Sequence, residues 1–212
     1  MERVFVHGLG QTPTAWEKVL LHVNDGEHSL CPDLIVFGRN KDVSYENLYK
    51  GLVEFCNNID APIDLCGLSL GGVLALNYAI DNPEKVNSLV LIATQFRMPK
   101  RLLKIQNILF RFMPKSMFQS MGFEKHDYIY LCKTMMELDF CNSLHTITCP
   151  VMVVYGEKDY ANKKAAVELA SILKNSMLKV IRGSGHEVNI DEPEKLGKLL
   201  SEFYYSNLLV NK

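Results

Sequence analysis

Residues 67–72 read Gly-Leu-Ser-Leu-Gly-Gly, between an apolar run at residues 63–66 (Ile-Asp-Leu-Cys) and a stretch at residues 70–81 with the composition of a helix. A strand that turns directly into a helix needs small residues at the corner, because side chains there would hold the two backbones apart. The stretch therefore predicts a tight strand-to-helix corner, with a strained serine whose hydroxyl is exposed at the tip.

Short apolar runs followed by Gly-rich or polar corners recur along the chain, with helical stretches between them. Runs that are apolar at successive positions are typical of strands covered on both faces, and helical connections between strands imply a parallel sheet. We predict an α/β fold, a three-layer α/β/α arrangement around a mostly parallel sheet of about six strands. The runs lie at residues 4–6, 63–66, 89–92, 151–155 and 178–181, with a weaker candidate at 31–34, and the helices at 15–23, 45–57, 70–81, 163–174 and 193–205.

Residues 96–148, here called the lid segment, break this alternation. They lie between two predicted strands and have the composition of helices rather than of a single crossover. An insertion of this length in a compact domain is usually functional. We expect a helical lid over the sheet edge where the corners gather, inserted into a single domain whose core comprises residues 1–95 and 149–212.

Composition excludes several classes of protein. The net charge of -1 over 212 residues gives no overall attraction to nucleic acid. The apolar run near the start is too short for a signal peptide, and no run approaches the ~18 residues of a membrane span, so we expect a cytoplasmic protein without stable membrane insertion. The six cysteines form no C-x-x-C pair, which predicts neither disulfides nor a zinc site, and we expect no metal and no cofactor.

Ser69 needs two partners, because a serine hydroxyl is a weak nucleophile without an adjacent base that a third group orients. Asp159 follows the run at 151–155 and is the leading acid, although an Asp before a helix also suits a capping role. Glu157 is its nearest rival. The other corner where an acid could stand, residues 93–96 (Ala-Thr-Gln-Phe), has no carboxylate. We therefore predict Asp159 as the orienting acid.

His186 is the predicted base. It follows the last apolar run, in a loop whose small residues at 183–185 allow the imidazole to return over Ser69. His7 is the alternative, but as the last residue of a strand it suits bracing of the next loop better. The other four histidines lie outside the predicted strand corners. They are His22, His28, His126 and His145.

Developing negative charge on a substrate oxygen requires N–H donors fixed in advance. The backbone N–H of Leu70, directly after the serine, is one candidate, and the N–H of Leu9 in the loop His7-Gly8-Leu9-Gly10 is the other. The residues that we expect to line a substrate pocket are Gly8, Gln11, Phe96, Phe112 and Met117.

These motifs resemble those of the α/β-hydrolase family, in its small esterase-like branch. The resemblance rests on the loop at 7–10 with Trp16, the corner at 67–72, the Gly-Glu-Lys-Asp at 156–159, and Gly185-His186 followed by Asp-Glu-Pro-Glu at 191–194. It implies the fold, the three catalytic residues and the two N–H donors at these positions. It also implies a trimmed sheet, because the family's first two strands have no counterpart before His7.

The resemblance predicts hydrolysis of a small carboxylic ester or thioester through an acyl-enzyme. Two alternatives stay open: cleavage of a carbon–carbon bond by the same residues, as a hydrolase or lyase, and a non-catalytic receptor for a small molecule. Halide or epoxide opening is disfavoured, because the corner carries Ser and not Asp. Lids vary across the family and set the substrate, so the acyl chain of the substrate stays open as well. The oligomeric state is also left open by the sequence.

The start of the lid segment is basic, with no acidic residue from 97 to 115. A basic amphipathic helix can attract anionic or amphiphilic substrates or a lipid surface. The alternative is a solvated lid surface whose apolar side packs inward. The basic residues are Arg97, Lys100, Arg101, Lys104, Arg111 and Lys115, interleaved with Leu, Ile and Phe.

Overall fold

The computed structural model describes residues 2–38, 42–119 and 123–210. Its strands form one sheet in the order β2-β1-β3-β4-β5-β6, with every neighbouring pair parallel. This confirms the predicted α/β fold and the sheet of about six strands. The strands are β1 (Arg3–Val6), β2 (Ser29–Leu30), β3 (Ile63–Leu68), β4 (Val86–Ile92), β5 (Val151–Gly156) and β6 (Ser176–Ile181).

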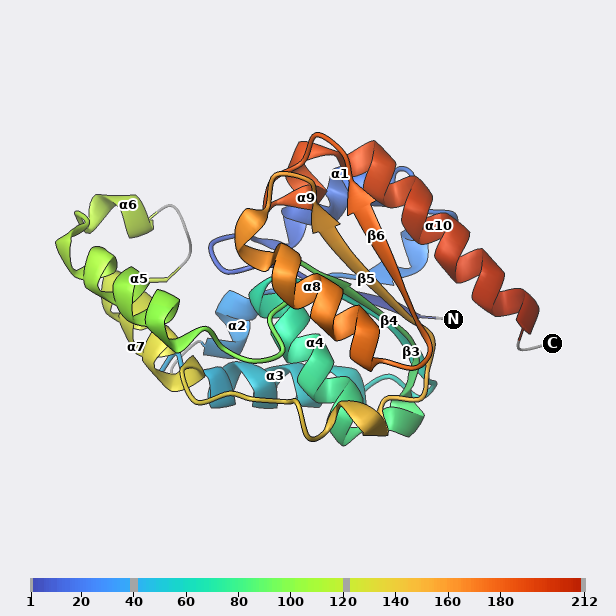
Figure 1. Cartoon of the computed structure of the whole chain (residues 1–212), viewed down its shortest axis with the longest axis horizontal. Coiled ribbons are helices and arrows are strands. Elements are labelled where there is room, and N and C mark those ends of the chain that lie inside the picture. Colours follow the sequence, from blue (N-terminus) through green and yellow to red (C-terminus); the bar gives the residue numbers. More distant parts are fainter. Residues whose placement is uncertain (1, 39–41, 120–122, 211–212) are drawn as a thin grey trace.

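Helices cover both faces of the sheet (Figure 1). Alternate residues of a buried strand point to opposite faces, and in β1 the side chains of Val4 and Val6 join one core cluster while Phe5 joins the other, with Trp16. The first cluster lies under α3 (Tyr45–Asn57), α4 (Leu70–Asp81) and α8 (Tyr160–Ile172), and the second under α1 (Glu17–Leu20) and α10 (Pro193–Val210).

The predicted helices agree with the structure in place, and two of them, α3 and α4, also in both bounds. Helix α8 begins at Tyr160, before the predicted residue 163, because the Asp159 side chain caps it by accepting a hydrogen bond from the Asn162 N–H at 3.3 Å. The stretch at 15–23 is shorter than predicted, since a 3-10 turn (Pro13–Trp16) precedes α1. Helix α10 extends five residues beyond the predicted end at 205.

Two strand predictions need correction. The candidate at 31–34 is not a strand: β2 ends at Leu30, Pro32 has no N–H to donate to a sheet, and α2 (Leu34–Gly38) begins directly after. The run at 178–181 does lie in β6, but it is not covered on both faces. β6 is the edge strand beside β5, and Leu178 and Val180 are 36% and 44% exposed.

The order of the strands places a crevice beside Ser69. The chain goes from β1 outward to β2 on one side and then returns to β3 on the other. At such a reversal the connecting loops leave in opposite directions, which opens a crevice at the carboxyl ends of the two strands. The loop after β1 and the corner after β3 therefore face each other across the expected binding site.

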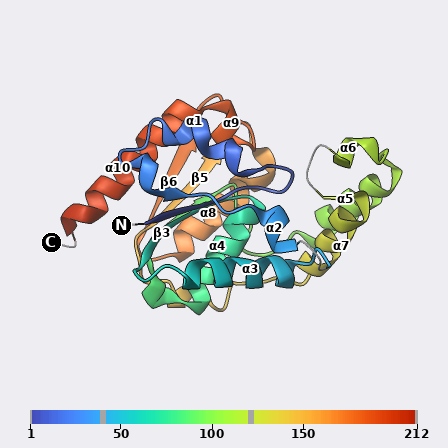
Figure 2. The same ribbon diagram turned by 180° about the vertical axis from the view of Figure 1, so that it is seen from behind.

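The lid segment contains the helices α5 (Lys100–Phe112), α6 (Ser116–Gln119) and α7 (Lys125–Met135). Helices α5 and α7 pack together and, with α6, project from the rest of the molecule as an arm in both views (Figures 1 and 2). Asn107 donates a hydrogen bond to the Ile129 carbonyl at 2.9 Å, and Lys125 donates to the carbonyls of Arg111 and Met113 at the end of α5. In the described part of the chain, no helix is long and apolar enough to cross a bilayer.

Candidate active site

Ser69 lies at the corner between β3 and α4 with φ 54° and ψ −115°, a conformation that L-residues rarely adopt. The flanking glycines permit it. A Cβ on Gly67 would lie 2.3 Å from the carbonyl oxygen of Gly71, and a Cβ on Gly71 would lie 2.2 Å from that of Val6. Any side chain at either position would push α4 away from the sheet, so the predicted tight corner depends on these two glycines.

Ser69 and His186 are within hydrogen-bond distance, with 3.0 Å between the serine Oγ and the imidazole Nε2. The loop after β6 that carries His186 is fixed by two carboxylates. Glu157 accepts from the Gly183 N–H at 3.0 Å, and Asp191 accepts from the Gly185 N–H at 2.7 Å. Glu157, the rival acid, is therefore occupied with the loop and does not contact the imidazole.

Asp159 contacts the other side of the ring, with 3.0 Å between its Oδ2 and His186 Nδ1. Its side chain is only 4% exposed. Burial by itself raises the pKa of the Asp159 carboxyl, but hydrogen bonds from His186 and Asn162 lower it more, so the pKa lies below its ordinary value. Asp159 thus combines the helix cap with the contact to His186, which were two separate interpretations of the sequence.

Two amides complete this network, and sequence reasoning missed both. Asn162 Nδ2 lies 2.9 and 2.8 Å from the two oxygens of Asp159, and Asn162 Oδ1 accepts a hydrogen bond from Gln95 Nε2 at 2.8 Å. The carboxylate fixes the orientation of the Asn162 amide, since only the NH₂ group can donate to it. Two features of the sequence were available as signals for these residues. One is an amide three residues after Asp159, and the other is Gln95 at the corner that lacks a carboxylate.

The loop after β1 is fixed by His7 and Gln11 from its two ends. Buried His7 accepts from the Leu34 N–H at 3.1 Å, and burial lowers its pKa despite Asp33 nearby, which agrees with a bracing role. Gln11 accepts from the Gly8 N–H at 3.2 Å. Its NH₂ group donates to Glu187 at 2.9 Å and Asn189 at 3.2 Å, which joins this loop to the segment after His186.

Leu9 and Leu70, the predicted sources of N–H donors, both border the cavity at Ser69. Leu70 is the first residue of α4, so its N–H belongs to the helix N-terminus, where backbone donors lack partners within the helix. Among the described residues, the N–H groups of Leu9 and Leu70 donate no backbone hydrogen bond. Both N–H groups thus lack a backbone partner, and both residues border the cavity.

The cavity at Ser69 has a volume of about 530 Å³ and lies between the carboxyl edge of the sheet and the arm. Its wall is mostly apolar, and it contains no Lys or Arg among the described residues. The lining residues are Leu9, Ser69, Leu70, Val73, Ala93, Gln95, Met98, Pro99, Leu103, Gln106, Phe110, Tyr128, Cys132, Met135, Asp159, Ala161, Asn162 and His186.

None of the five predicted pocket residues borders this cavity. Gly8 and Gln11 form the loop brace, and Phe96 is 3% exposed within the core. Phe112 and Met117 are 84% and 50% exposed on the arm, whereas Leu103, Gln106 and Phe110 of α5 border the cavity. The structure therefore does not bring these five residues to the cavity at Ser69.

A second hollow, of about 600 Å³, lies on the arm. Its lining includes Lys115, Phe118, Phe123, Lys125 and Ile129, and it contains none of the residues that contact Ser69. Within the described ranges, no three His, Cys, Asp or Glu side chains come together in an arrangement that could hold a metal ion.

Comparison with known proteins finds relatives of low sequence identity. A biotin biosynthesis bifunctional protein BioHC of Teredinibacter turnerae is 23% identical, covering 94% of this chain and 44% of its own length. Monoacylglycerol lipase ABHD6 of Mus musculus is 23% identical, covering 68% and 49%. A pimeloyl-[acyl-carrier protein] methyl ester esterase of Nitrosomonas europaea is 28% identical, covering 43% and 36%. The chain thus spans about half the length, or less, of these curated relatives.

Solved structures share the fold. The enol-lactonase from Burkholderia xenovorans superposes with a TM-score of 0.82 at 17% identity, covering 96% of this chain and 91% of that one. The esterase from Exiguobacterium antarcticum gives 0.80 at 18% identity, covering 97% and 92%. The model of the "Alpha/beta hydrolase family" matches residues 4–198. Since this match covers nearly all of the 212 residues, the chain belongs to the alpha/beta hydrolase family.

Proposed function

We propose that the protein hydrolyses a carboxylic ester or thioester through an acyl-enzyme formed on Ser69. The observation that supports this most directly is the continuous contact from the Ser69 hydroxyl through His186 to Asp159, at 3.0 Å for each step, on the wall of the cavity. Esterases and lipases among the relatives and the solved structures agree with this class of reaction.

In the proposed reaction, Ser69 Oγ attacks the acyl carbonyl carbon while its proton passes to His186 Nε2. Asp159 accepts the Nδ1–H, which selects the tautomer that leaves Nε2 free, and it stabilises the imidazolium that forms. The carbonyl oxygen becomes an anion that the N–H groups of Leu9 and Leu70 bind. His186 then gives the proton to the leaving alcohol or thiol. In the second half, water attacks the acyl carbon and gives its proton to His186, which passes a proton to Ser69 Oγ as the acid leaves.

Asn162 and Gln95 act in this scheme as positioning residues. The Asn162 NH₂ group holds both oxygens of Asp159 and prevents the carboxylate from rotating away from His186. Gln95 fixes the Asn162 amide from the cavity side. Fixed second partners of this kind set the orientation of a reacting group, and their loss lowers the rate without abolishing the reaction.

The cavity supports a neutral acyl group as substrate. Its volume of about 530 Å³ falls within the ~300–1,000 Å³ of small-molecule sites. Leu70, Met98, Phe110 and Met135 present an apolar wall, and no cation among the described lining residues is available to pair with a carboxylate on the acyl chain. We therefore expect p-nitrophenyl butyrate to be cleaved faster than the p-nitrophenyl monoester of a dicarboxylic acid.

Labelling with a serine-directed fluorophosphonate probe tests the proposal. The wild-type chain should be labelled, with the adduct on Ser69 in the peptide digest, and Ser69→Ala should not. Replacing such a nucleophile lowers the turnover of a p-nitrophenyl ester by up to ~10⁶. A matched control is Ser171→Ala, an exposed serine on α8. Folded wild-type protein that is neither labelled nor active would indicate a receptor instead of a hydrolase.

A further inference from the structure

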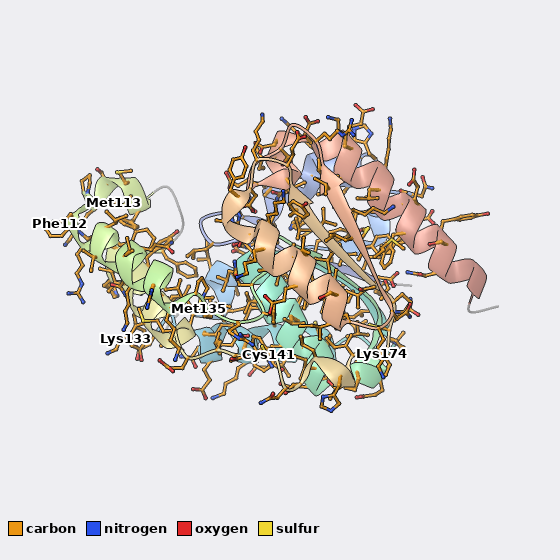
Figure 3. All side chains as sticks on the ribbon, in the orientation of Figure 1. Phe112, Met113, Lys133, Met135, Cys141 and Lys174 are labelled. Atoms are coloured by element: carbon orange, nitrogen blue, oxygen red, sulfur yellow. The ribbon has the colours of Figure 1, made fainter. Side chains whose placement is uncertain are left out.

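Helix α5 of the lid segment leaves large apolar side chains in solvent. Ile105, Ile108, Leu109 and Phe112 are 55%, 54%, 57% and 84% exposed. Figure 3 shows Phe112 at the end of the arm, pointing away from the core. The alternative in which the apolar side of this helix packs inward is therefore wrong for these four residues.

These side chains form one continuous face. At about 100° per residue, the four lie within an arc of about 100° on the helix. Leu103, Asn107 and Phe110 are turned to the opposite side, where Phe110 packs against residues of the core cluster and Asn107 bonds to α7. The exposed apolar face, defined here as Ile105, Ile108, Leu109 and Phe112, thus points away from both the cavity and α7.

Positive charge surrounds this face. Arg101 lies within its arc, Lys104 and Arg111 follow within about 60° of its edge, and Lys115 comes shortly after the helix. All four are exposed, and none has an ion-pair partner among the described residues. Lys100 and Arg97, by contrast, are neutralised by Glu137 and Asp139.

We propose that the exposed apolar face of α5 docks the protein on an anionic bilayer surface. The four apolar side chains enter the boundary between headgroups and acyl chains, and Arg101, Lys104, Arg111 and Lys115 contact anionic headgroups, which is the arrangement of helices that lie in a membrane interface. A second copy of the chain is a poorer occupant, because apposed copies would bring these unpaired cations against each other.

Docking through this face gives the cavity a defined relation to the surface. The same helix that enters the interface supplies Leu103, Gln106 and Phe110 to the cavity wall from its other side. An amphiphilic ester that leaves the bilayer therefore meets the cavity one helix away. The docking is independent of the proposed hydrolysis, since none of the docking residues contacts Ser69, His186 or Asp159.

Vesicle co-sedimentation of the full chain carrying Ser69→Ala tests the proposal without any turnover. We expect binding to phosphatidylcholine–phosphatidylglycerol vesicles that weakens with added salt, and little binding to phosphatidylcholine alone. Each basic residue near an anionic surface raises partitioning about fivefold. The double variant Lys104→Glu/Arg111→Glu should therefore bind at least about 25-fold more weakly than the parent. Phe112→Ser should bind about tenfold more weakly.

Matched controls separate docking from changes in net charge or stability. Lys163→Glu/Lys174→Glu makes the same charge change on the core, where Lys174 lies far from the arm in Figure 3, and it should bind within about threefold of the parent. Leu21→Ser removes an apolar side chain that is 81% exposed on the core and should bind like the parent. Short-ester turnover of each variant with Ser69 restored verifies its fold.

Three outcomes would overturn the proposal. One is equal binding to neutral and anionic vesicles. Another is unchanged binding by Lys104→Glu/Arg111→Glu. The third is a dimeric mass in solution that Phe112→Ser converts to a monomer, which would assign the exposed apolar face to a second copy. Each leaves the hydrolysis proposal standing, because fluorophosphonate labelling at Ser69 is measured without vesicles.

Discussion

Replacing Asn162 with Ala tests whether the amide network contributes to the chemistry. The substitution removes the NH₂ group that lies 2.9 and 2.8 Å from the two Asp159 oxygens, and it leaves the backbone N–H of residue 162 to cap α8. Hydrogen bonds to a charged group contribute about 1.5–3 kcal/mol. The Asp159 side chain is 4% exposed, so water replaces the lost donor poorly.

This energy translates into a moderate loss of rate. A loss of about 1.5–3 kcal/mol in transition-state stabilisation lowers kcat/KM about 10- to 150-fold. We expect the lower part of that range, because Asp159 keeps His186 and the backbone N–H as partners. The variant should therefore lie well above Asp159→Asn, for which the wrong tautomer of the base costs about 10⁴.

The assay combines p-nitrophenyl butyrate turnover with the second-order rate of fluorophosphonate labelling. Both rates should fall by similar factors, with KM nearly unchanged and the thermal midpoint within a few degrees of wild type. Gln95→Ala should lose about threefold, and the double variant should resemble Asn162→Ala, because Gln95 acts through Asn162. Wild-type labelling by folded Asn162→Ala, or a loss confined to KM, would refute the positioning role.

Three further predictions follow from single contacts. Gly71→Ala should lower the free energy of unfolding by at least about 1–3 kcal/mol and remove most of the turnover, because its Cβ would lie 2.2 Å from the Val6 carbonyl oxygen. An unchanged midpoint in thermal denaturation would contradict this. Iodoacetamide at neutral pH should leave turnover intact although Cys132 lines the cavity, because burial raises the pKa of this thiol to about 11; rapid inactivation that Cys132→Ala prevents would argue against it. The pKa of Asp159 is lowered on folding, so its charge stabilises the fold above the unfolded pKa of ~3.9, and that contribution disappears as the pH falls through the folded pKa. In urea titrations, the difference in unfolding free energy between wild type and Asp159→Asn should therefore shrink in acid. A difference that does not depend on pH would be inconsistent with this.

The corner at Ser69 was predictable from the sequence because its causes are local. An apolar strand, two glycines and a helix follow each other within twenty residues, and they suffice to fix the conformation of Ser69. The places of Asp159 and His186 were predictable for a different reason. Parallel strands bring their carboxyl ends to one edge, so chain order alone puts residues that follow β5 and β6 near one that follows β3.

The failures concern properties that depend on neighbours. Whether the apolar residues of β6 are covered depends on its being the edge strand, and no pattern within residues 176–181 indicates that. Phe112 was assigned to the pocket, but the amphipathic pattern of residues 97–115 does not say which face of the helix meets the rest of the molecule. Asn162 and Gln95 were missed because an amide near a predicted acid, or at a corner without a carboxylate, does not by itself indicate a bracing role; its partners identify it.

The contacts around Ser69 also predict that chemistry and specificity are separable in this chain. The hydrogen bonds that orient Ser69, His186 and Asp159 come from loops after β3, β4, β5 and β6, and the Gln11 brace joins the loop after β1 to the same edge. None of them involves a described residue of the lid segment. The lid segment instead supplies the cavity wall and the exposed apolar face. Changes in α5 should therefore alter KM, acyl preference and surface binding, while labelling of Ser69 by a small fluorophosphonate stays constant.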